Sequence, residues 1–100
     1  MNNFRTLDLA IKFYHETQNL GLRGTVRDQL QRAALSISLN LSEGRGKPTR
    51  KDQLRFFHIA FGSVRECQTI YKILRLSSSD SNQTLDSLAA SLYRLIQRAR

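Results

Sequence analysis

The spacing of apolar residues along the chain predicts a series of helices. From Phe4 to Leu20, apolar residues recur at spacings of three and four, which places them on one helical face. They are Phe4, Leu7, Ile11 and Tyr14, with Ala10 and Phe13 widening the stripe. Gly21 and Gly24 interrupt this pattern, and Thr25 followed by Asp28 resembles a capping box with Asp in place of Glu. A second helix is therefore expected to begin at Thr25.

The segment from Leu35 to Ser42 fits two kinds of secondary structure. Its apolar and polar residues alternate strictly, which is the period of a half-buried strand. Helical spacing nevertheless continues through it, and no other segment offers a partner strand. The residues that keep helical spacing are Val26, Leu30, Ala33, Ala34, Ile37 and Leu41. We therefore expect the second helix to continue through this segment.

A basic loop is expected to separate the second helix from a long third one. Gly44, Gly46 and Pro48 should end the second helix, and Thr49 can cap a helix that starts near Arg50. This third helix should reach about Leu76 and run roughly 40 Å at 1.5 Å per residue. It carries two apolar stripes: Leu54, Phe57, Phe61, Val64 and Tyr71 on one side, and Phe56, Ile59, Ala60, Ile70, Ile73 and Leu74 on the other. Two stripes are more apolar surface than one bundle core should use.

The polar stretch from Ser77 to Asn82 is short enough to be a turn, and it supplies several possible caps for a last helix. That helix has a single apolar face, formed by Leu85, Leu88, Ala89, Leu92, Leu95, Ile96 and Ala99. Four helices with short connections favour antiparallel neighbours. The pattern therefore predicts an all-α protein, an antiparallel up-and-down four-helix bundle, with residues 1–100 in a single domain.

Composition adds charge and location to this picture. Sixteen Lys and Arg against eight Asp and Glu give a net charge of +8, which predicts an acidic partner. Twelve of these cations are Arg, whose planar fork suits phosphate and carboxylate groups. The chain lacks an apolar run of the ~20 residues that a membrane span needs, and its first residues do not resemble a signal peptide. The expected location is therefore the cytoplasm, with no membrane partner.

Few residues suggest catalysis or metal binding. Cys67 is the only cysteine, and His15 and His58 lie on different predicted helices, so neither a nucleophile with its base nor a metal-ligand spacing is recognisable. We interpret Cys67 as a buried small hydrophobe and His58 as a partly buried spacer. The Gly62-Ser63 pair is interpreted as a close helix crossing. The sequence thus predicts a protein without enzymatic activity, cofactor or metal.

The strongest candidate for a functional site is a cluster of cations around the predicted basic loop. Five cations lie within residues 45–55, where the only acid is Asp52. With two cations at the start of the second helix, the candidate contacts are Arg23, Arg27, Arg45, Lys47, Arg50, Lys51 and Arg55. A merely solvated surface is the alternative, but the whole chain has a charge excess of the same sign. Since the aromatic residues lie on the apolar stripes, we expect salt-sensitive binding to a nucleic-acid backbone rather than stacking on bases.

The central half of the chain resembles a bacterial four-helix-bundle family. Residues 29–44 fit the pattern Gln-x-x-Arg-Ala-Ala-x-Ser-Ile-x-x-Asn-(Ile/Leu)-(Ala/Ser)-Glu-Gly, and residues 55–66 fit Arg-Phe-x-x-Ile-Ala-x-Gly-Ser-x-x-Glu. This family includes the proteins encoded in intervening sequences of large-subunit ribosomal RNA genes and the accessory variability determinant of diversity-generating retroelements. The first and last predicted helices resemble the family only in kind.

The resemblance implies a ring-like homopentamer of four-helix bundles. For the retroelement branch it also implies a basic surface that binds a reverse transcriptase and its RNA or DNA. The second stripe on the third helix would then meet a neighbouring subunit. The basic loop and the charge of +8 look more like the accessory determinant, and the alternative is an intervening-sequence protein with a structural or RNA-associated role.

Six polar residues of the matching segments share helical faces on the second and third helices. They are Arg32, Ser36, Asn40, Glu43, Ser63 and Glu66. We expect them to form one structural polar network between these two helices. On that hypothesis, Glu66→Gln should lower the melting temperature.

Overall fold

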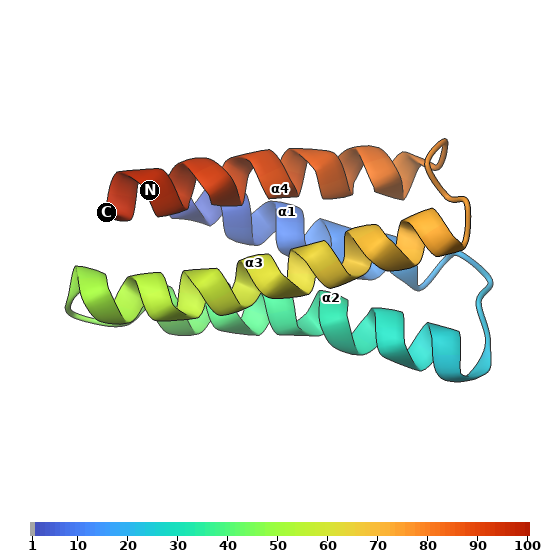
Figure 1. Ribbon diagram of the computed structural model, residues 1–100, viewed down its shortest axis with the longest axis horizontal. Coiled ribbons are helices and arrows are strands. Elements are labelled where there is room, and N and C mark those ends of the chain that lie inside the picture. Colours follow the sequence, from blue (N-terminus) through green and yellow to red (C-terminus); the bar gives the residue numbers. More distant parts are fainter. Residues whose placement is uncertain (1) are drawn as a thin grey trace.

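A computed structural model describes the backbone of residues 2–100 and the side chains of residues 5–100. Over these residues the chain forms four α-helices and no strand (Figure 1). The helices are α1 (Asn2–Thr17), α2 (Gly24–Arg45), α3 (Arg50–Ile73) and α4 (Asp80–Ala99). This confirms the predicted number and order of helices, whereas the expected place of Phe4 in the apolar stripe of α1 lies outside the described side chains.

The helices form an up-and-down bundle of 39 × 22 × 18 Å. α1 and α3 each pack against both α2 and α4, whereas the diagonal pairs do not touch through their backbones. Because each helix runs antiparallel to the next, both chain termini and the α2–α3 loop lie at one end of the bundle (Figure 1). We call this end the terminal end and the opposite one, which carries the α1–α2 and α3–α4 loops, the far end. The predicted fold is thereby confirmed.

All four helices contribute to one core. Its buried apolar residues are Ala10, Phe13, Leu30, Ala33, Ala34, Ile37, Leu41, Phe57, Ala60, Val64, Cys67, Tyr71, Leu85, Leu88, Leu92 and Ile96. The Phe13 and Tyr71 rings meet across the diagonal between α1 and α3, with centroids 5.7 Å apart. Two pairs of buried hydroxyls bond to each other: Tyr71 Oη lies 2.7 Å from Ser81 Oγ, and Thr6 Oγ1 lies 2.6 Å from Ser91 Oγ. These pairs remove the desolvation cost that an unpaired buried hydroxyl would impose.

The segment with strict alternation is helical. Ile37 and Leu41 are buried, whereas Leu35 and Leu39 are 42% and 59% exposed. A strand would have placed all four residues on one face, so their division between core and solvent follows the helical period instead. Burial of Ile37 and Leu41 against the other helices therefore decides the conformation, and the strand alternative is wrong.

Two expectations about apolar stripes need correction. In α1, Ala10 and Phe13 are fully buried, whereas Ile11, expected on the inner stripe, is 42% exposed. In α3, the second stripe does not form one continuous outer face, because Ser63 and Glu66 lie in its middle. Its members divide into buried Ala60, half-buried Phe56, Ile70 and Leu74, and exposed Ile59 and Ile73. Two separate apolar patches result, one toward each end of the bundle.

The close helix approach occurs at Gly44 and not at Gly62. Gly44 lies buried within α2, where an added Cβ would stand 2.8 Å from Phe57 Cε1. Gly62 is exposed, and an added Cβ would meet no described heavy atom within 4 Å. The interpretation of Gly62-Ser63 as a helix crossing is therefore wrong. Gly44 does not end α2 either, since the helix continues to Arg45 and Gly46 is its C-cap.

Hydroxyl caps begin two of the helices. Thr49 Oγ1 accepts a hydrogen bond from the backbone N–H of Asp52 at 3.2 Å, as predicted, and Ser79 Oγ accepts one from the N–H of Asn82 at 3.3 Å. These bonds satisfy backbone donors that the first turn of a helix leaves free. The start of α2 differs from the expected capping box: Arg23 is the N-cap and makes no side-chain cap bond.

The α3 helix ends before the expected Leu76. Arg75 adopts a left-handed backbone conformation with φ 58°, which a helix cannot continue through. The N–H of Leu76 then turns back to the carbonyl of Tyr71 at 2.9 Å. This is the hydrogen bond of a Schellman-type helix end, with an arginine where glycine is usual.

Candidate nucleic-acid interface

The loop between α2 and α3 is fixed by hydrogen bonds that involve few of its charged groups. The N–H of Gly46 bonds to the carbonyls of Ser42 and Glu43, at 3.3 and 3.2 Å, and closes the last turn of α2. Gln53 Nε2 donates to the carbonyl of Lys47 at 3.0 Å, while Thr49 caps α3. A short, fixed turn therefore presents the cations of residues 45–55 at the terminal end.

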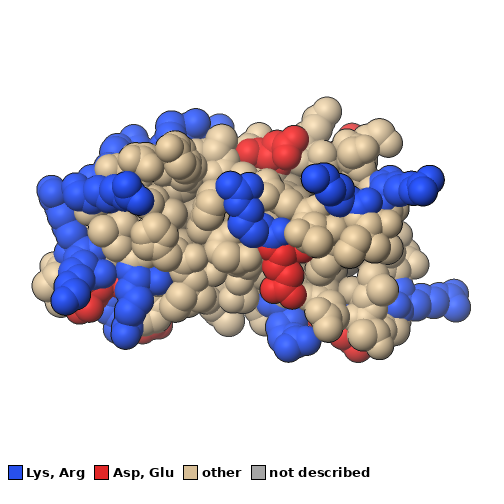
Figure 2. All heavy atoms as spheres, in the orientation of Figure 1, with Lys and Arg blue, Asp and Glu red and all other residues tan. Residues whose placement is uncertain are grey.

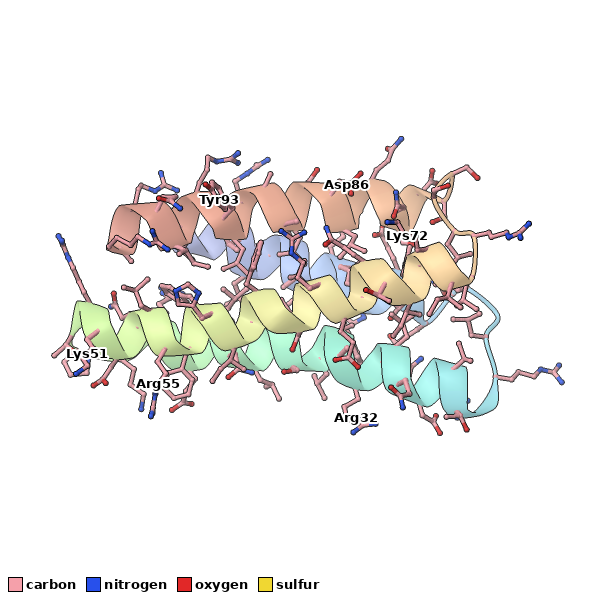
Figure 3. All side chains as sticks on the ribbon, viewed as in Figure 1. Arg32, Lys51, Arg55, Lys72, Asp86 and Tyr93 are labelled. Atoms are coloured by element: carbon pink, nitrogen blue, oxygen red, sulfur yellow. The ribbon has the colours of Figure 1, made fainter. Side chains whose placement is uncertain are left out.

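Five of the seven predicted contact residues lie at this end: Arg45, Lys47, Arg50, Lys51 and Arg55. Arg50, Lys51 and Arg55 are exposed, and Figure 3 shows Lys51 and Arg55 on the first turns of α3. Lys47 Nζ lies 3.2 Å from Glu43 Oε2, a half-exposed ion pair that screening by water weakens. These five cations therefore gather at one end of the bundle.

One aromatic ring lies among these cations. Lys47 Nζ and the Arg55 guanidinium carbon lie 5.1 and 5.0 Å from the centroid of the Phe56 ring, which is half-buried. Such cation–π contacts hold the two charged side chains beside the ring. The expectation that aromatic residues stay apart from the cations is wrong at Phe56.

The end of α4 adds cations that the sequence prediction did not place in the site. Arg94, Arg98 and Arg100 are exposed at the terminal end, together with Arg5 of α1. The antiparallel order of four helices could have located them, because the end of the fourth helix must lie beside the second loop. Figure 2 shows Lys and Arg side chains crowding this end of the molecule.

The charge is unevenly divided along the bundle. With each helix divided at its middle, the terminal half contains nine cations and three acids, a net charge of +6. The cations are Arg5, Arg45, Lys47, Arg50, Lys51, Arg55, Arg94, Arg98 and Arg100, and the acids are Asp8, Glu43 and Asp52. The far half contains seven cations and five acids, a net charge of +2. We call the nine cations of the terminal half the basic end.

Arg23 and Arg27 do not belong to the basic end. Both are exposed at the start of α2, which lies at the far end of the bundle. Arg27 Nη2 also lies 3.1 Å from Asp28 Oδ1, so part of its charge is compensated locally. The seven candidate cations therefore lie on two separate surfaces, because α2 spans the length of the bundle between Arg27 and Arg45.

The predicted polar network forms only in part. Ser63 Oγ donates to Ser36 Oγ at 3.0 Å, and Asn40 Nδ2 donates to Ser36 Oγ at 3.1 Å and to the Ser36 carbonyl at 2.9 Å. These three half-buried residues join α2 to α3. Arg32 and Glu66, by contrast, are exposed and make no hydrogen bond or ion pair within the described part of the chain.

Arg32 extends from α2 away from the bundle (Figure 3). The third predicted member to fall outside the network, Glu43, pairs with Lys47 instead. The network in the structure is therefore a triad of Ser36, Asn40 and Ser63. Since Glu66 is outside it, the structural reason to expect a lower melting temperature for Glu66→Gln is removed.

The remaining reactive groups are placed unfavourably for catalysis. Cys67 is buried, and desolvation, followed by the charge of Glu66, raises the pKa of its thiol to about 12. A thiol with this pKa stays protonated at neutral pH and is a poor nucleophile. His58 is exposed rather than partly buried. Among residues 5–100, no three His, Cys, Asp or Glu side chains are grouped to hold a metal ion.

None of the described helices is both long and apolar enough to cross a bilayer.

Comparison with known proteins identifies the family. Residues 5–98 match the model of the 23S rRNA-intervening sequence protein family. The chain belongs to this family. The match covers nearly the whole chain, including the first and last helices, so it extends the resemblance that the central segments indicated. No curated protein matches the sequence.

A solved structure shares the fold of this chain. It is a protein of unknown function from the S23 ribosomal protein family of Bacteroides thetaiotaomicron, with a TM-score of 0.71 and 17% sequence identity. The similarity covers 99% of this chain and 95% of the other. At this identity the likeness extends to the fold alone, and it agrees with the four-helix bundle described above.

Proposed function

We propose that the protein is a non-enzymatic, cytoplasmic accessory protein that binds nucleic acid through its basic end. The observation that supports this proposal most strongly is the net charge of +6 on the terminal half, which contains six of the eight excess positive charges of the chain. A concentrated field of this sign attracts polyphosphates, and each phosphate that is neutralised releases condensed counterions.

The chemistry of the basic end suits phosphates better than bases. Seven of its nine cations are arginines, whose forked donors fit phosphate oxygens. They come from α1, from α4, and from α2 and α3 with the loop between them, so they spread over an end of the bundle rather than along one inserting helix. We infer binding to the backbone of RNA or DNA, with Arg45, Lys47, Arg50, Lys51 and Arg55 as central contacts and little sequence preference.

The biological setting that we propose is support of a reverse transcriptase in a diversity-generating retroelement. The basic α2–α3 loop and the overall charge support this branch of the resemblance. The alternative is an RNA-associated role of a protein encoded in an intervening sequence, which the description of the matching family favours. A gene beside a reverse transcriptase would support the first setting, and a gene within a large-subunit ribosomal RNA gene would support the second.

We also propose that the bundles assemble into a homo-oligomer, a ring-like pentamer by the resemblance. Exposed apolar side chains on the outer surfaces of α2 and α3 support this proposal. Leu35, Leu39 and Ile59 are 42%, 59% and 47% exposed. Burying them between subunits would be favourable, at about 25 cal/mol per Å² of apolar surface. Light scattering on the purified protein tests the proposal, and a monomeric mass across micromolar concentrations would contradict it.

Two double variants test the nucleic-acid proposal, because they make the same change in charge at opposite ends of the bundle. The variant Arg50→Glu/Lys51→Glu changes the basic end, whereas Arg23→Glu/Arg27→Glu changes the far end by the same amount. All four side chains are exposed, so neither variant should disturb the core. Binding to a fluorescent duplex and to a single strand is measured by anisotropy between 50 and 300 mM salt.

We expect the first variant to bind much more weakly. Each phosphate contact on a duplex contributes about 0.9 to the slope of log affinity against log salt, so the loss of two contacts should make this slope shallower by about two units. The second variant should remain close to the unaltered protein. Equal losses in the two variants would show that total charge matters and the basic end does not. Affinity independent of salt would contradict the phosphate mechanism altogether.

A further inference from the structure

An apolar groove lies at the far end of the bundle, between the start of α2 and the end of α3. It has a volume of about 230 Å³ and is lined by Thr25, Val26, Gln29, Ile70, Ile73 and Leu74. Ile73 is 71% exposed, more than any other described large apolar side chain, and Val26 is 41% exposed. A concave apolar surface beside a protruding isoleucine gains from being covered, because both surfaces then leave water.

The groove is bordered by positive charge. The residues next to its lining in the chain include three cations, Arg23, Arg27 and Arg75, and one acid, Asp28, a net charge of +2. Lys72 does not belong to this border, because it lies on the side of α3 that faces α4 (Figure 3). Asp28 is already paired with Arg27, which leaves Arg23 and Arg75 exposed and without an ion pair within the described part of the chain. A partner that covers this groove must therefore be compatible with uncompensated positive charge.

The position of Arg75 is a second, independent observation. Its φ of 58° is the only positive φ among the described non-glycine residues. Glycine or asparagine adopts this conformation at lower cost, and glycine is the usual residue at this point of a helix end. The chain thus carries a cation at a strained backbone position beside the groove. A cation there also complements the negative end of the α3 dipole.

We propose that the groove binds an acidic amphipathic helix of a partner protein. Apolar side chains of that helix fill the groove against Val26 and Ile73, and its carboxylates pair with Arg23 and Arg75. This is the helix-in-groove mode of recognition, with charge complementarity at its border. A second copy of the chain fits poorly: a two-fold contact would bring two basic borders face to face, and a head-to-tail contact in a ring would set the border against a bundle whose two halves are both positive, +6 and +2.

The probe is a synthetic helical peptide of glutamate and alanine with leucines at i, i+3 and i+7, labelled with fluorescein. Its control peptide has the same composition with the leucines distributed around the helix. Anisotropy gives the two dissociation constants, and ¹⁵N-resolved NMR shifts locate the site. We expect tighter binding of the first peptide and shifts concentrated in residues 23–29 and 70–76. Equal affinity for the two peptides, or shifts centred on the basic end, would overturn the proposal.

Matched variants separate the groove from general charge attraction. Ile73→Glu places a repelling carboxylate in the groove, and Tyr93→Glu makes the same change at an exposed aromatic residue of α4, 55% exposed and outside the groove. We expect Ile73→Glu to weaken binding of the amphipathic peptide about tenfold or more, which corresponds to about 1.4 kcal/mol. Tyr93→Glu should change it little. Similar losses in both variants would overturn the proposal.

Substitutions of Arg75 distinguish a role in peptide binding from a role in ending α3. Arg75→Gly removes the strained conformation, so its melting temperature should equal or exceed that of the unaltered protein, while the peptide binds more weakly. Arg75→Lys should keep most of the affinity. If Arg75→Gly binds the peptide as well as the unaltered protein, the cation serves the helix end alone. A smaller oligomer for Ile73→Glu in light scattering would show that another subunit covers the groove, and would also overturn the proposal.

Discussion

Gly44 offers a stability test in which one methyl group has a calculable effect. The Cβ of an alanine at this position would stand 2.8 Å from Phe57 Cε1 and 3.0 Å from both Phe56 Cβ and Phe57 Cδ1. Phe57 is only 2% exposed, so its ring cannot move into solvent. Overpacking of this kind costs about 1–3 kcal/mol. Alanine returns at most about 1 kcal/mol through its higher helix propensity.

We therefore expect Gly44→Ala to lower the free energy of unfolding by about 1–2 kcal/mol. For a chain of this size the melting temperature should fall by roughly 5–10 °C. Circular dichroism during heating and during urea titration measures both quantities, with all variants at one protein concentration because association would shift the transition. The m-value should stay constant, since the substitution does not change the surface exposed on unfolding.

Gly62→Ala is the matched control, with the opposite expected sign. Gly62 lies in the middle of α3, is exposed, and has open space where a Cβ would go. Alanine should therefore raise the free energy of unfolding by about 0.5–1 kcal/mol. A Gly44→Ala protein as stable as the unaltered one would refute the close approach of α2 to Phe57. The same sign of change in both variants would refute the reasoning from space and propensity.

Three further predictions concern buried and capping groups. Thr6→Val should lower the free energy of unfolding by about 1–3 kcal/mol, since it leaves the buried Ser91 hydroxyl unpaired; Thr6→Val/Ser91→Ala should recover part of this loss in urea titrations. Thr49→Ala should lower it by about 1 kcal/mol in the same assay, because it removes the α3 cap. Cys67 should resist a thiol reagent until the protein unfolds. Rapid labelling of the folded protein would contradict the burial of Cys67. The pKa of the thiol rises from 9.0 to about 12 on folding. The stability that this thiol contributes should therefore be complete below pH 9 and be lost as pH rises toward 12, which urea titrations at increasing pH measure.

The pattern of apolar residues predicted the helices well because a bundle buries one face of each helix. Val64 and Leu88 lie in the core as the helical period requires. The same pattern could not separate Ala60 from Ile59, because it does not show how far the core extends around α3. Nor could it show that Gly44, rather than Gly62, faces a ring, since that depends on the register between α2 and α3. The left-handed conformation of Arg75 has no signal in residue type, because glycine is usual there.

The candidate site was predictable where it is local in sequence. The cations from Arg45 to Arg55 form a cluster because a short loop and one helix start hold them together. The polar network was predicted from helical faces alone, and faces do not show depth: Ser36 and Ser63 lie between α2 and α3, whereas Glu66 lies on the exposed side. Residues on one stripe of a helix can therefore be buried to different extents, because the stripe does not show which of them point toward the neighbouring helix.

The division of charge between the two ends of the bundle follows from its topology. In an up-and-down bundle of four helices, the second loop and both termini must share one end, and the first and third loops must share the other. Cations placed in the second loop and after the last helix are therefore brought together, although residues 45–55 and 94–100 are distant in the sequence. By the same rule Arg23 and Arg75, which follow α1 and α3, meet at the far end beside an apolar groove. The two binding sites that we propose, the basic end and the apolar groove flanked by cations, therefore lie at opposite ends of one chain.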